Sequence, residues 1–334
     1  MLRKGAITLA LLLALAAVVV IRPDLSIAEV QAQYQKPFSK FATLRDGTKL
    51  HYWDRGSTSA PALVLLHGSY DCADTWEEWA PQLENDFHLI VPDLPAHGLT
   101  GKTVSGDYSA EAMAGAVHEL IEQLELPRVH IAGNSMGGRV AWVYAAAHPE
   151  RVDRLVLIDS AGYPNKNSVS PSASNPVMEW LLVHGNPKRL IRQGFVRAVG
   201  ESDEALITDA RVDRWTAYVR REGSRDAHRQ RAVQNANLPS GQPRIAQIQT
   251  PTLILWGDHD PLIPVEHARF FDRDLPNATL IVYEGVDHMP QLEIPERSAN
   301  DTRAFLLTAA KPAKPAEPTE PAKPPVEPAA PAAK

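Results

Sequence analysis

Cysteine is nearly absent from this sequence: Cys72 is the only one in 334 residues. A single thiol cannot form an intrachain disulfide, and it cannot supply the two or four thiolates of common zinc sites. An excess of positive charge is also lacking, because 34 Lys and Arg face 40 Asp and Glu, giving a net charge of −6. Such a mildly acidic chain argues against nucleic acid as a general partner.

One long uncharged run is present, from Gly5 to Ile21, directly after Arg3 and Lys4. As a helix it would span roughly 25 Å, slightly less than the ~30 Å core of a bilayer, and it is long for a signal-peptide core. We interpret residues 1–28 as an N-terminal membrane anchor or a signal peptide cleaved near Ala28. The flanking positive charges favour export, so we expect a cell-envelope protein, anchored through residues 5–21 or secreted to the periplasm or beyond.

The C-terminal segment, residues 311–334, consists of Pro, Ala, Lys and Glu apart from one Thr and one Val. It cannot bury enough apolar surface to offset its ordering entropy, so we expect a disordered tail. A solvated tail without a specific partner is the simplest interpretation, and a spacer or a ligand for an envelope partner is the alternative. The residues between the two ends are ample for a substantial core.

Apolar runs alternate with helix-like segments in the middle of the chain. The expected strands are Phe41–Leu44, Lys49–Arg55, Ala62–Leu66, His88–Val91, Val129–Ala132, Leu155–Ile158, Thr252–Trp256 and Leu280–Tyr283. The expected helices are Thr75–Leu83, a helix through Leu124 with Ser109 as its candidate N-cap, Gly137–Ala147, Val265–Leu275 and Pro295–Leu307. This alternation predicts an α/β fold with a mostly parallel central sheet flanked by helices, built from residues 29–161 and 249–310.

Residues 162–248 interrupt the alternation and are expected to form a helical cap, or lid, inserted between two sheet strands. Seven arginines crowd one part of this insertion: Arg211, Arg214, Arg220, Arg221, Arg225, Arg229 and Arg231. We interpret them as a solvated helical face; contact with anionic lipid or with substrate acids is the alternative.

A nucleophile motif lies between an expected strand and an expected helix, at Gly133-Asn134-Ser135-Met136-Gly137. The pattern G-x-S-x-G needs small residues on both sides of a serine held on a sharp turn. The following helix directs its positive end at the reacting centre, and the N–H of Met136 is placed to bind an oxyanion. The N–H of Ser69, after the strand Ala62–Leu66, is the second candidate donor for that oxyanion hole.

A serine nucleophile needs a base, and the base needs an orienting carboxylate. His288 follows the expected strand Leu280–Tyr283, and Asp260 follows the strand Thr252–Trp256, so both lie where open α/β sheets place their sites. Asp258, in the same loop as Asp260, and Asp159, after another strand, are rivals for the acid. We predict the catalytic triad Ser135, Asp260 and His288, in that chain order.

These motifs resemble those of the α/β-hydrolase superfamily from about Phe41 to Leu307. The matching pieces are His67-Gly68, Asp93-Leu94-Pro95-Ala96-His97-Gly98, Gly133 to Gly138, Trp256 to Pro264, and Asp287-His288. The resemblance implies the α/β-hydrolase fold and a lid at residues 162–248. It also favours Asp260 as the acid, because the last Asp of the family's Gly-x-x-Asp motif orients the histidine. The nucleophile turn is similar to that of hydrolases that cleave carbon–carbon bonds in ring-fission products.

The expected function is therefore a serine hydrolase that cleaves a carboxylic ester through an acyl-enzyme on Ser135. A carbon–carbon bond hydrolase and a cofactor-free perhydrolase would use the same triad, and a non-catalytic binding protein on this fold is the alternative from another class. We expect a small-molecule acyl substrate and no cofactor. We also expect no metal, although Asp258, His259 and Asp260 carry suitable ligands, because the triad accounts for Asp260. The sequence does not indicate an oligomeric state.

Overall fold

The computed structural model describes residues 22–165, 185, 187–236 and 242–308. Its strands are β1 (Ser39–Thr43), β2 (Lys49–Arg55), β3 (Ala62–Leu66), β4 (His88–Pro92), β5 (Val129–Asn134), β6 (Val152–Ile158), β7 (Thr252–Gly257) and β8 (Ala278–Tyr283). Its helices outside the insertion are α2 (Ile27–Tyr34), α3 (Ala80–Leu83), α4 (Ala110–Gln123), α5 (Met136–Ala147), α11 (Glu266–Asp274), α12 (Pro290–Glu293) and α13 (Pro295–Leu307). Two short 3₁₀ helices are η1 (Ala73–Trp76) and η2 (Pro149–Arg151).

The strands form one eight-stranded sheet in the order β1-β2-β4-β3-β5-β6-β7-β8. The pairs β1·β2 and β2·β4 are antiparallel, and every pair from β4·β3 to β7·β8 is parallel. The expected α/β fold with a mostly parallel central sheet is thus confirmed. Because β3, β5, β6, β7 and β8 run in the same direction, the loops after their carboxyl ends meet at one edge of the sheet.

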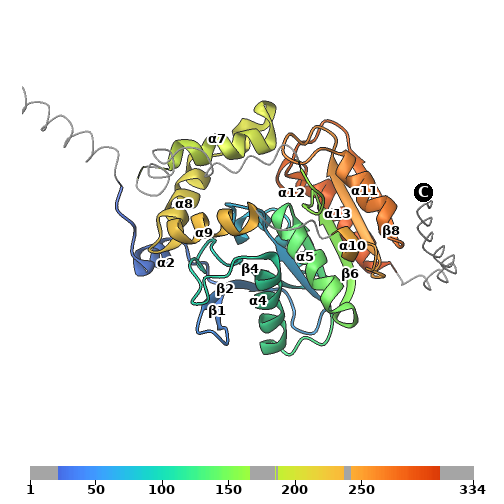
Figure 1. Cartoon of the computed structure of the whole chain (residues 1–334), viewed down its shortest axis with the longest axis horizontal. Helices are drawn as coiled ribbons and strands as arrows, with labels where there is room; N and C mark the ends of the chain where they lie inside the picture. Colours follow the sequence, from blue (N-terminus) through green and yellow to red (C-terminus); the bar gives the residue numbers. More distant parts are fainter. Residues whose placement is uncertain (1–21, 166–184, 186, 237–241, 309–334) are drawn as a thin grey trace, which may run out of the picture.

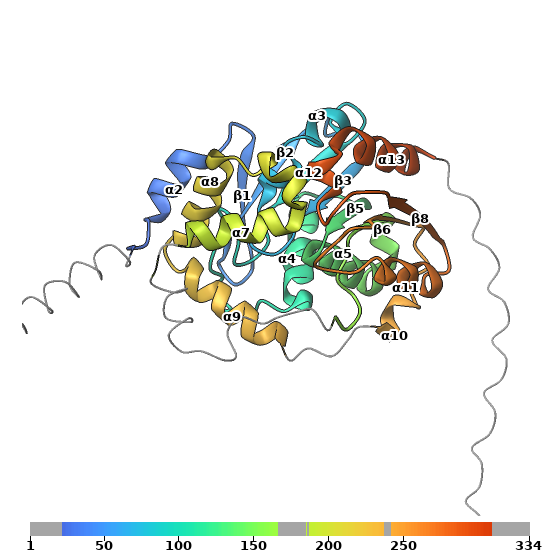
Figure 2. The ribbon, with the colours of Figure 1, turned by 90° about the horizontal axis from the view of Figure 1, so that it is seen from above.

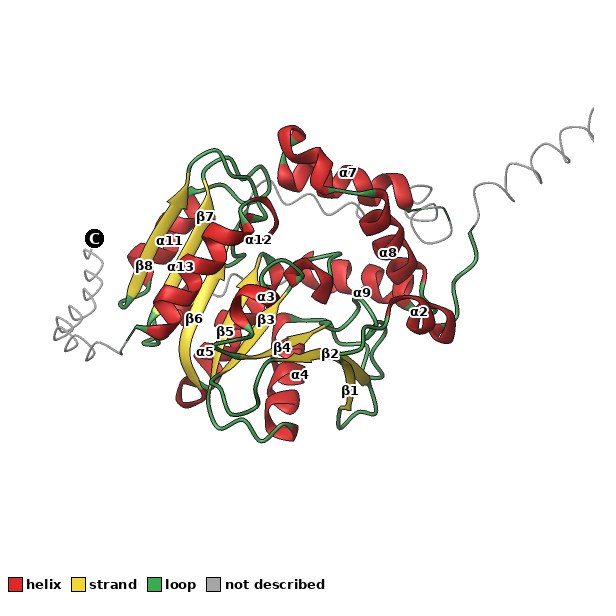
Figure 3. Cartoon of the chain, turned by 180° about the vertical axis from the view of Figure 1, so that it is seen from behind, coloured by secondary structure: helices red, strands yellow, loops and turns green. Residues whose placement is uncertain are grey.

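Two apolar cores cover the two faces of the sheet, and β3 shows how one strand serves both. Val64 and Leu66 pack into the core that contains α4, α5 and α11, whereas Leu63 and Leu65 pack into the core of α3 and α13. Figures 1 and 3 show the two helical layers from opposite sides. Burial on both faces explains why β3 is apolar at every position.

The first expected helix differs from the structure. Thr75–Leu83 is not one helix: the 3₁₀ helix η1 ends at Trp76, and the four-residue α3 begins at Ala80. Pro81 explains the break, because proline has no backbone N–H and its ring is tolerated only in the first turn of a helix. The longer helices follow the prediction closely, with Ser109 capping α4 by accepting the N–H of Ala112.

The described part of the insertion is helical, with α7 (Lys188–Val199), η3 (Glu201–Leu206), α8 (Asp209–Arg220), α9 (Ser224–Ala236) and α10 (Gln242–Ile245). Figures 1 and 2 show α7, α8 and α9 grouped together beside the sheet. The solvated-face interpretation of the arginine cluster is wrong for three of its members. Arg221, Arg225 and Arg231 are all less than a tenth exposed, because they point into contacts of the cap with its surroundings.

The segment before the core packs on this cap. In α2, Val30 is fully buried in the same apolar cluster as Trp215 and Tyr218 of α8, and Figure 1 shows α2 directly beside α8. Leu25 pairs with Arg221 in a short parallel bridge. The predicted domain boundary places residue 29 at the start of the α/β core, whereas the structure shows residues 25–34 in contact with the cap.

Within the described residues, no helix combines the length and apolarity that a membrane crossing requires. The predicted anchor or signal peptide at residues 5–21 lies outside the described residues, and so does the predicted tail at residues 311–334.

Candidate active site

Ser135 stands on a sharp turn between β5 and α5. Its φ of 55° and ψ of −116° lie in a region that side chains other than glycine rarely occupy, so the turn is strained. Close backbone contacts force this geometry: a Cβ on Gly133 would collide with the carbonyl of Gly137, and a Cβ on Gly137 would collide with that of Leu66. The glycines of the motif are therefore steric requirements, and they hold a half-buried serine at the edge where the parallel strands end.

His288 and Asp260 form a buried hydrogen-bonded pair. His288 Nδ1 lies 2.6 Å from Asp260 Oδ2, and both side chains are almost completely buried. The other oxygen of Asp260 accepts the N–H groups of Leu262 (2.7 Å) and Ile263 (2.9 Å). These bonds fix the carboxylate, which in turn holds the proton of His288 on Nδ1 and leaves Nε2 as the basic nitrogen.

The two rival acids have other partners. Asp258 accepts the N–H of Gly285 at 2.7 Å and so ties two loops together. Asp159 is fully buried, and its Oδ1 accepts the N–H of Gly257 at 3.0 Å. Burial and the neighbouring carboxylate of Asp260 raise the pKa of Asp159 well above its usual value. This shift favours the protonated form of Asp159.

Asp159, Asp260 and His288 also offer ligand atoms within 4.8 Å of one another, a spacing that could suit a metal ion. The donor set does not need one, because Asp260 is already engaged by His288 and two backbone N–H groups. The raised pKa of Asp159 favours its protonated form, and a protonated carboxyl group is a poor metal ligand. We derive no chemistry through a metal.

The predicted oxyanion donors lie on both sides of the serine. Met136 is the first residue of α5, where backbone N–H groups have no partner within the helix. The loop that carries Ser69 passes beside the nucleophile, since a Cβ on Gly68 would lie 3.3 Å from Cβ of Ser135. Neither the Met136 N–H nor the Ser69 N–H donates a hydrogen bond to another described residue, so both are open to a ligand.

His67 has a structural role in the loop before Ser69. Its Nε2 accepts the N–H of Leu94 at 2.9 Å, and its Nδ1 lies 2.8 Å from the carbonyl of Gly68. Both ring nitrogens are thus used to hold the loop before Ser69, and the imidazole is not available as a base.

Three positioning contacts around His288 were not predicted from the sequence. Asn134 Nδ2 donates to the carbonyl of His288 at 3.0 Å, which ties the base to the nucleophile turn. Glu293 accepts the N–H groups of Asp287 and Met289, each at 2.7 Å, on both sides of His288. Asn134 lies inside the nucleophile motif, which was a usable signal; the Glu293 contact depends on how α12 folds back, and the sequence gives no sign of it.

The third contact comes from the cap. The N–H of His288 donates to the carbonyl of Ala198 in α7 at 2.9 Å, and Met289 packs in an apolar cluster with Phe195 and Trp215. The loop that carries the base is therefore bound to the cap as well as to the core. A backbone hydrogen bond between residues that are 90 positions apart cannot be predicted from a sequence pattern.

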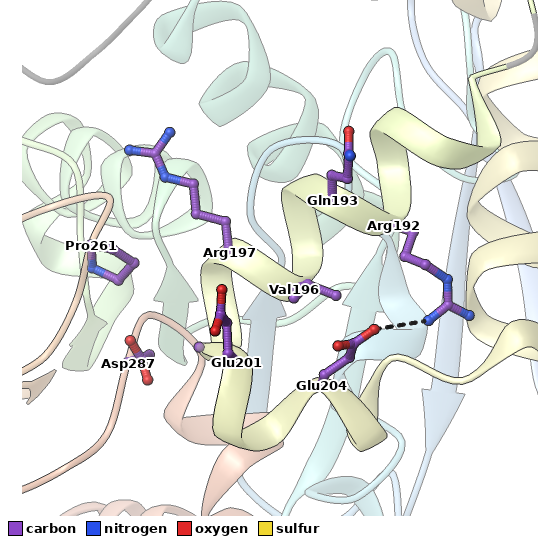
Figure 4. A pocket seen from close by; sticks show the side chains of 9 residues that line it. Arg192, Gln193, Val196, Arg197, Glu201, Glu204, Pro261 and Asp287 are labelled. Atoms are coloured by element: carbon purple, nitrogen blue, oxygen red, sulfur yellow. Dashed lines mark ion pairs between the residues drawn. The ribbon is translucent and has the colours of Figure 1, made fainter.

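A pocket of about 410 Å³ lies at this junction, between α7, η3 and the loops of Pro261 and Asp287. Figure 4 shows its mixed lining, including the ion pair between Arg192 and Glu204 at 4.0 Å. Most of its lining comes from α7 and η3, and only Pro261 and Asp287 neighbour Asp260 and His288 in the chain. Ser135 does not line this pocket.

Comparison with known proteins agrees with this architecture. A family model for the alpha/beta hydrolase fold matches residues 61–295. Lipase 1 of Psychrobacter immobilis is 32% identical over 276 residues, which cover 80% of this chain and 83% of the lipase. The 2-hydroxy-6-oxononadienedioate/2-hydroxy-6-oxononatrienedioate hydrolase of Cupriavidus pinatubonensis is 28% identical over 277 residues, covering 80% and 94%. The solved structure of a bacterial membrane phospholipase A matches with a TM-score of 0.67 at 27% identity, covering 91% of this chain and 98% of that one.

The region matched by the family model contains strands β3 to β8, the strained serine turn and the histidine–aspartate pair. The chain therefore belongs to the alpha/beta hydrolase fold family and is a hydrolase.

Proposed function

We propose that this hydrolase cleaves carboxylic esters by nucleophilic catalysis on Ser135. His288 Nε2 takes the proton of Ser135 Oγ as the oxygen bonds to the carbonyl carbon. The N–H groups of Met136 and Ser69 bind the resulting oxyanion. His288 then gives its proton to the departing alcohol, leaving an acyl-enzyme. Water attacks the acyl carbon, His288 takes the water's proton and returns it to Ser135, and the free acid leaves.

One observation carries this proposal: the strained turn holds Ser135 at the same sheet edge as a buried histidine whose Nδ1 is fixed by Asp260. An ordinary structural serine has no need of a costly backbone conformation. The similarity to a lipase and to a membrane phospholipase A supports an ester as the substrate.

Hydrolysis of a carbon–carbon bond is the second candidate, favoured by the similarity to the 2-hydroxy-6-oxononadienedioate hydrolase. A cofactor-free perhydrolase would use the same triad. The discriminating experiment compares kcat/KM for a series of p-nitrophenyl esters, for that ring-fission dienedioate, and for peroxide with acetate. We expect the esters to be the preferred substrates and Ser135→Ala to abolish their turnover. Faster cleavage of the dienedioate than of every ester would replace the ester proposal.

We also propose an envelope location, with the apolar run at residues 5–21 as an uncleaved anchor. The contacts of residues 22–28 support an intact N-terminus. Asp24 pairs with Arg225 at 2.9 Å, and Ser26 caps α2 by accepting the N–H of Glu29. Cleavage after Ala28 would cut through α2 and remove these contacts. The similarity to a membrane phospholipase A is consistent with this arrangement.

A further inference from the structure

The cap places a buried guanidinium next to the proposed oxyanion hole. Arg231 extends from α9 and is only 7% exposed. Its Nη1 donates to Oγ of Ser69 at 3.2 Å and lies 3.5 Å from Sδ of Met136. The backbone N–H groups of these same two residues are the proposed oxyanion donors. A positive charge thus lies beside the place where the ester carbonyl would bind.

This charge has no counter-ion among the described residues. Two other buried cap arginines are paired: Arg214 lies 3.1 Å from a carboxylate oxygen of Asp74, and Arg225 lies 2.9 Å from one of Asp24. The described part of the chain contains no carboxylate within ion-pair distance of Arg231, and its Nε has no hydrogen-bond partner there. A buried cation without a counter-ion is costly, so its retention needs a reason.

The surroundings of Arg231 do not supply a negative charge. Its guanidinium lies over the ring of Tyr70, 5.1 Å from the centroid, and the ring of His228 stacks on the same tyrosine at a centroid distance of 4.9 Å. The ring of His228 contacts the ring of His97, which in turn contacts the ring of His67. Burial, with Arg231 contributing, lowers the pKa of His228 to about 3 and that of His97 well below its usual value. The histidines are therefore neutral, and Arg231 is the charge of this cluster.

We propose that Arg231 binds an anionic oxygen group of the substrate, a carboxylate or a phosphate, and so selects esters that carry a negative charge. This inference rests on the proposed ester hydrolysis and names its substrate class. The guanidinium fork matches the geometry of both groups, and a bound anion would supply the missing counter-ion in a water-poor site. The group would lie close to Ser69 and Met136, on the acyl or the alcohol side of the scissile bond.

The test compares esters that differ only in charge. Monoethyl adipate is paired with ethyl hexanoate for a carboxylate on the acyl side, and carboxyethyl butyrate with propyl butyrate for the alcohol side. Phosphoethyl butyrate carries a phosphate in place of the carboxylate. We measure the ratio of kcat/KM for each anionic ester to that for its neutral partner. We expect the wild-type ratio of kcat/KM to exceed one for at least one anionic ester. Whether the carboxylate or the phosphate ester gives the higher ratio shows which anionic group the site prefers.

Substitution of the arginine should change that ratio. We expect Arg231→Gln to lower it by about 10- to 100-fold, the cost of one charge-assisted hydrogen bond, and Arg231→Lys to give an intermediate value. Arg229→Gln is the matched control on the same helix, because Arg229 is exposed and pairs with Asp226 at 2.9 Å. This control should leave the ratio unchanged.

Two results would overturn the inference while leaving ester hydrolysis intact. One is a wild-type ratio below one for every pair. The other is an equal loss on charged and neutral esters in Arg231→Gln, which would make Arg231 a general support of the oxyanion hole. Should Arg231→Gln not fold, the wild-type ratios and Arg231→Lys decide the question. Turnover of no ester at all, by folded wild-type protein, would instead remove the proposed function itself.

Discussion

Two carboxyl groups lie near His288, and their environments differ. Asp260 receives two backbone N–H groups on one oxygen and bonds the imidazole through the other. Asp159 receives a single N–H, and burial together with the neighbouring Asp260 raises the pKa of Asp159 well above its usual value, which favours the protonated form. In the proposed reaction Asp260 holds the imidazolium of His288, whereas Asp159 contributes its shape and its hydrogen bonds.

This difference predicts unequal effects of the same substitution. Asp260→Asn should lower kcat on one activated ester by about 10⁴-fold, because the amide holds the wrong histidine tautomer. Asp159→Asn should lower kcat by less than about tenfold, because an amide is close in shape to the protonated carboxyl group that the raised pKa of Asp159 favours. Circular dichroism of both variants checks their folding. If Asp159→Asn lost its activity while Asp260→Asn stayed active, Asp159 and not Asp260 would be the acid that orients His288.

His228 offers a prediction on pH and stability. Its folded pKa is lowered to about 3 by burial first and by Arg231 second, against about 6.5 in the unfolded chain. Because the folded pKa is depressed, the neutral ring contributes stability that is complete above pH 6.5 and is lost as the pH falls. Between pH 7 and pH 5 this loss amounts to about 2 kcal/mol.

The measurement is urea unfolding at those two pH values. His228→Phe keeps a ring against Tyr70 and removes the titration, so its unfolding free energy should fall by about 2 kcal/mol less than that of the wild type between pH 7 and pH 5. Equal falls in the two proteins would mean that the pKa of His228 is not lowered by folding.

Sequence patterns predict single residues well where a local turn defines their chemistry. Ser135 and its glycines belong to one short motif, and Asp260 and His288 each follow an expected strand. The sequence could not choose between Asp260 and Asp159 by spacing alone, since both follow strand ends; the hydrogen bonds of the folded loops distinguish them. Nor could it show that Arg231 is buried, because a charged residue on a polar helix normally faces water.

At the scale of elements, the loop between β8 and α12 is held from three sides. Asn134 binds it from the nucleophile turn, Ala198 from the cap, and Glu293 from α12. The strand–helix alternation predicts the loop and its place at the sheet edge. These three contacts depend on tertiary packing, and no periodicity encodes them.

The hydrogen bonds that Glu293 accepts from the loop of His288 predict that removal of this side chain lowers kcat and leaves KM nearly unchanged. Glu293→Ala removes the acceptor for two N–H groups that flank His288, and the misplaced imidazole should lower kcat by about 10- to 100-fold. KM should change little, because Glu293 does not contact the proposed substrate site. Glu296→Ala, at an exposed position of α13, is the control. A rise in KM at unchanged kcat would contradict a positioning role.

At the scale of the whole molecule, the cap connects the catalytic loop to the N-terminal segment. Trp215 and Tyr218 of α8 contact α2 and its cluster, and α7 of the same cap binds His288. The segment that follows the predicted anchor is therefore joined to the cap rather than hanging free from the core.

This arrangement predicts a membrane-attached protein with an intact N-terminus. Cell fractionation should place the full-length chain in the membrane fraction, and N-terminal sequencing should find a start near residue 1. A mature N-terminus near Glu29 would show cleavage instead. Full-length protein found only in the cytosol would contradict the envelope proposal.

The central claim is that Ser135 carries the acyl group during turnover, and intact-protein mass spectrometry tests it most directly. The protein is mixed with p-nitrophenyl butyrate and quenched in acid within the first turnovers. The account predicts a species heavier by one butyryl group, with the label on the peptide that contains Ser135, and no such species in Ser135→Ala. Ester hydrolysis at an undiminished rate in Ser135→Ala, or an acyl label on another residue, would contradict it.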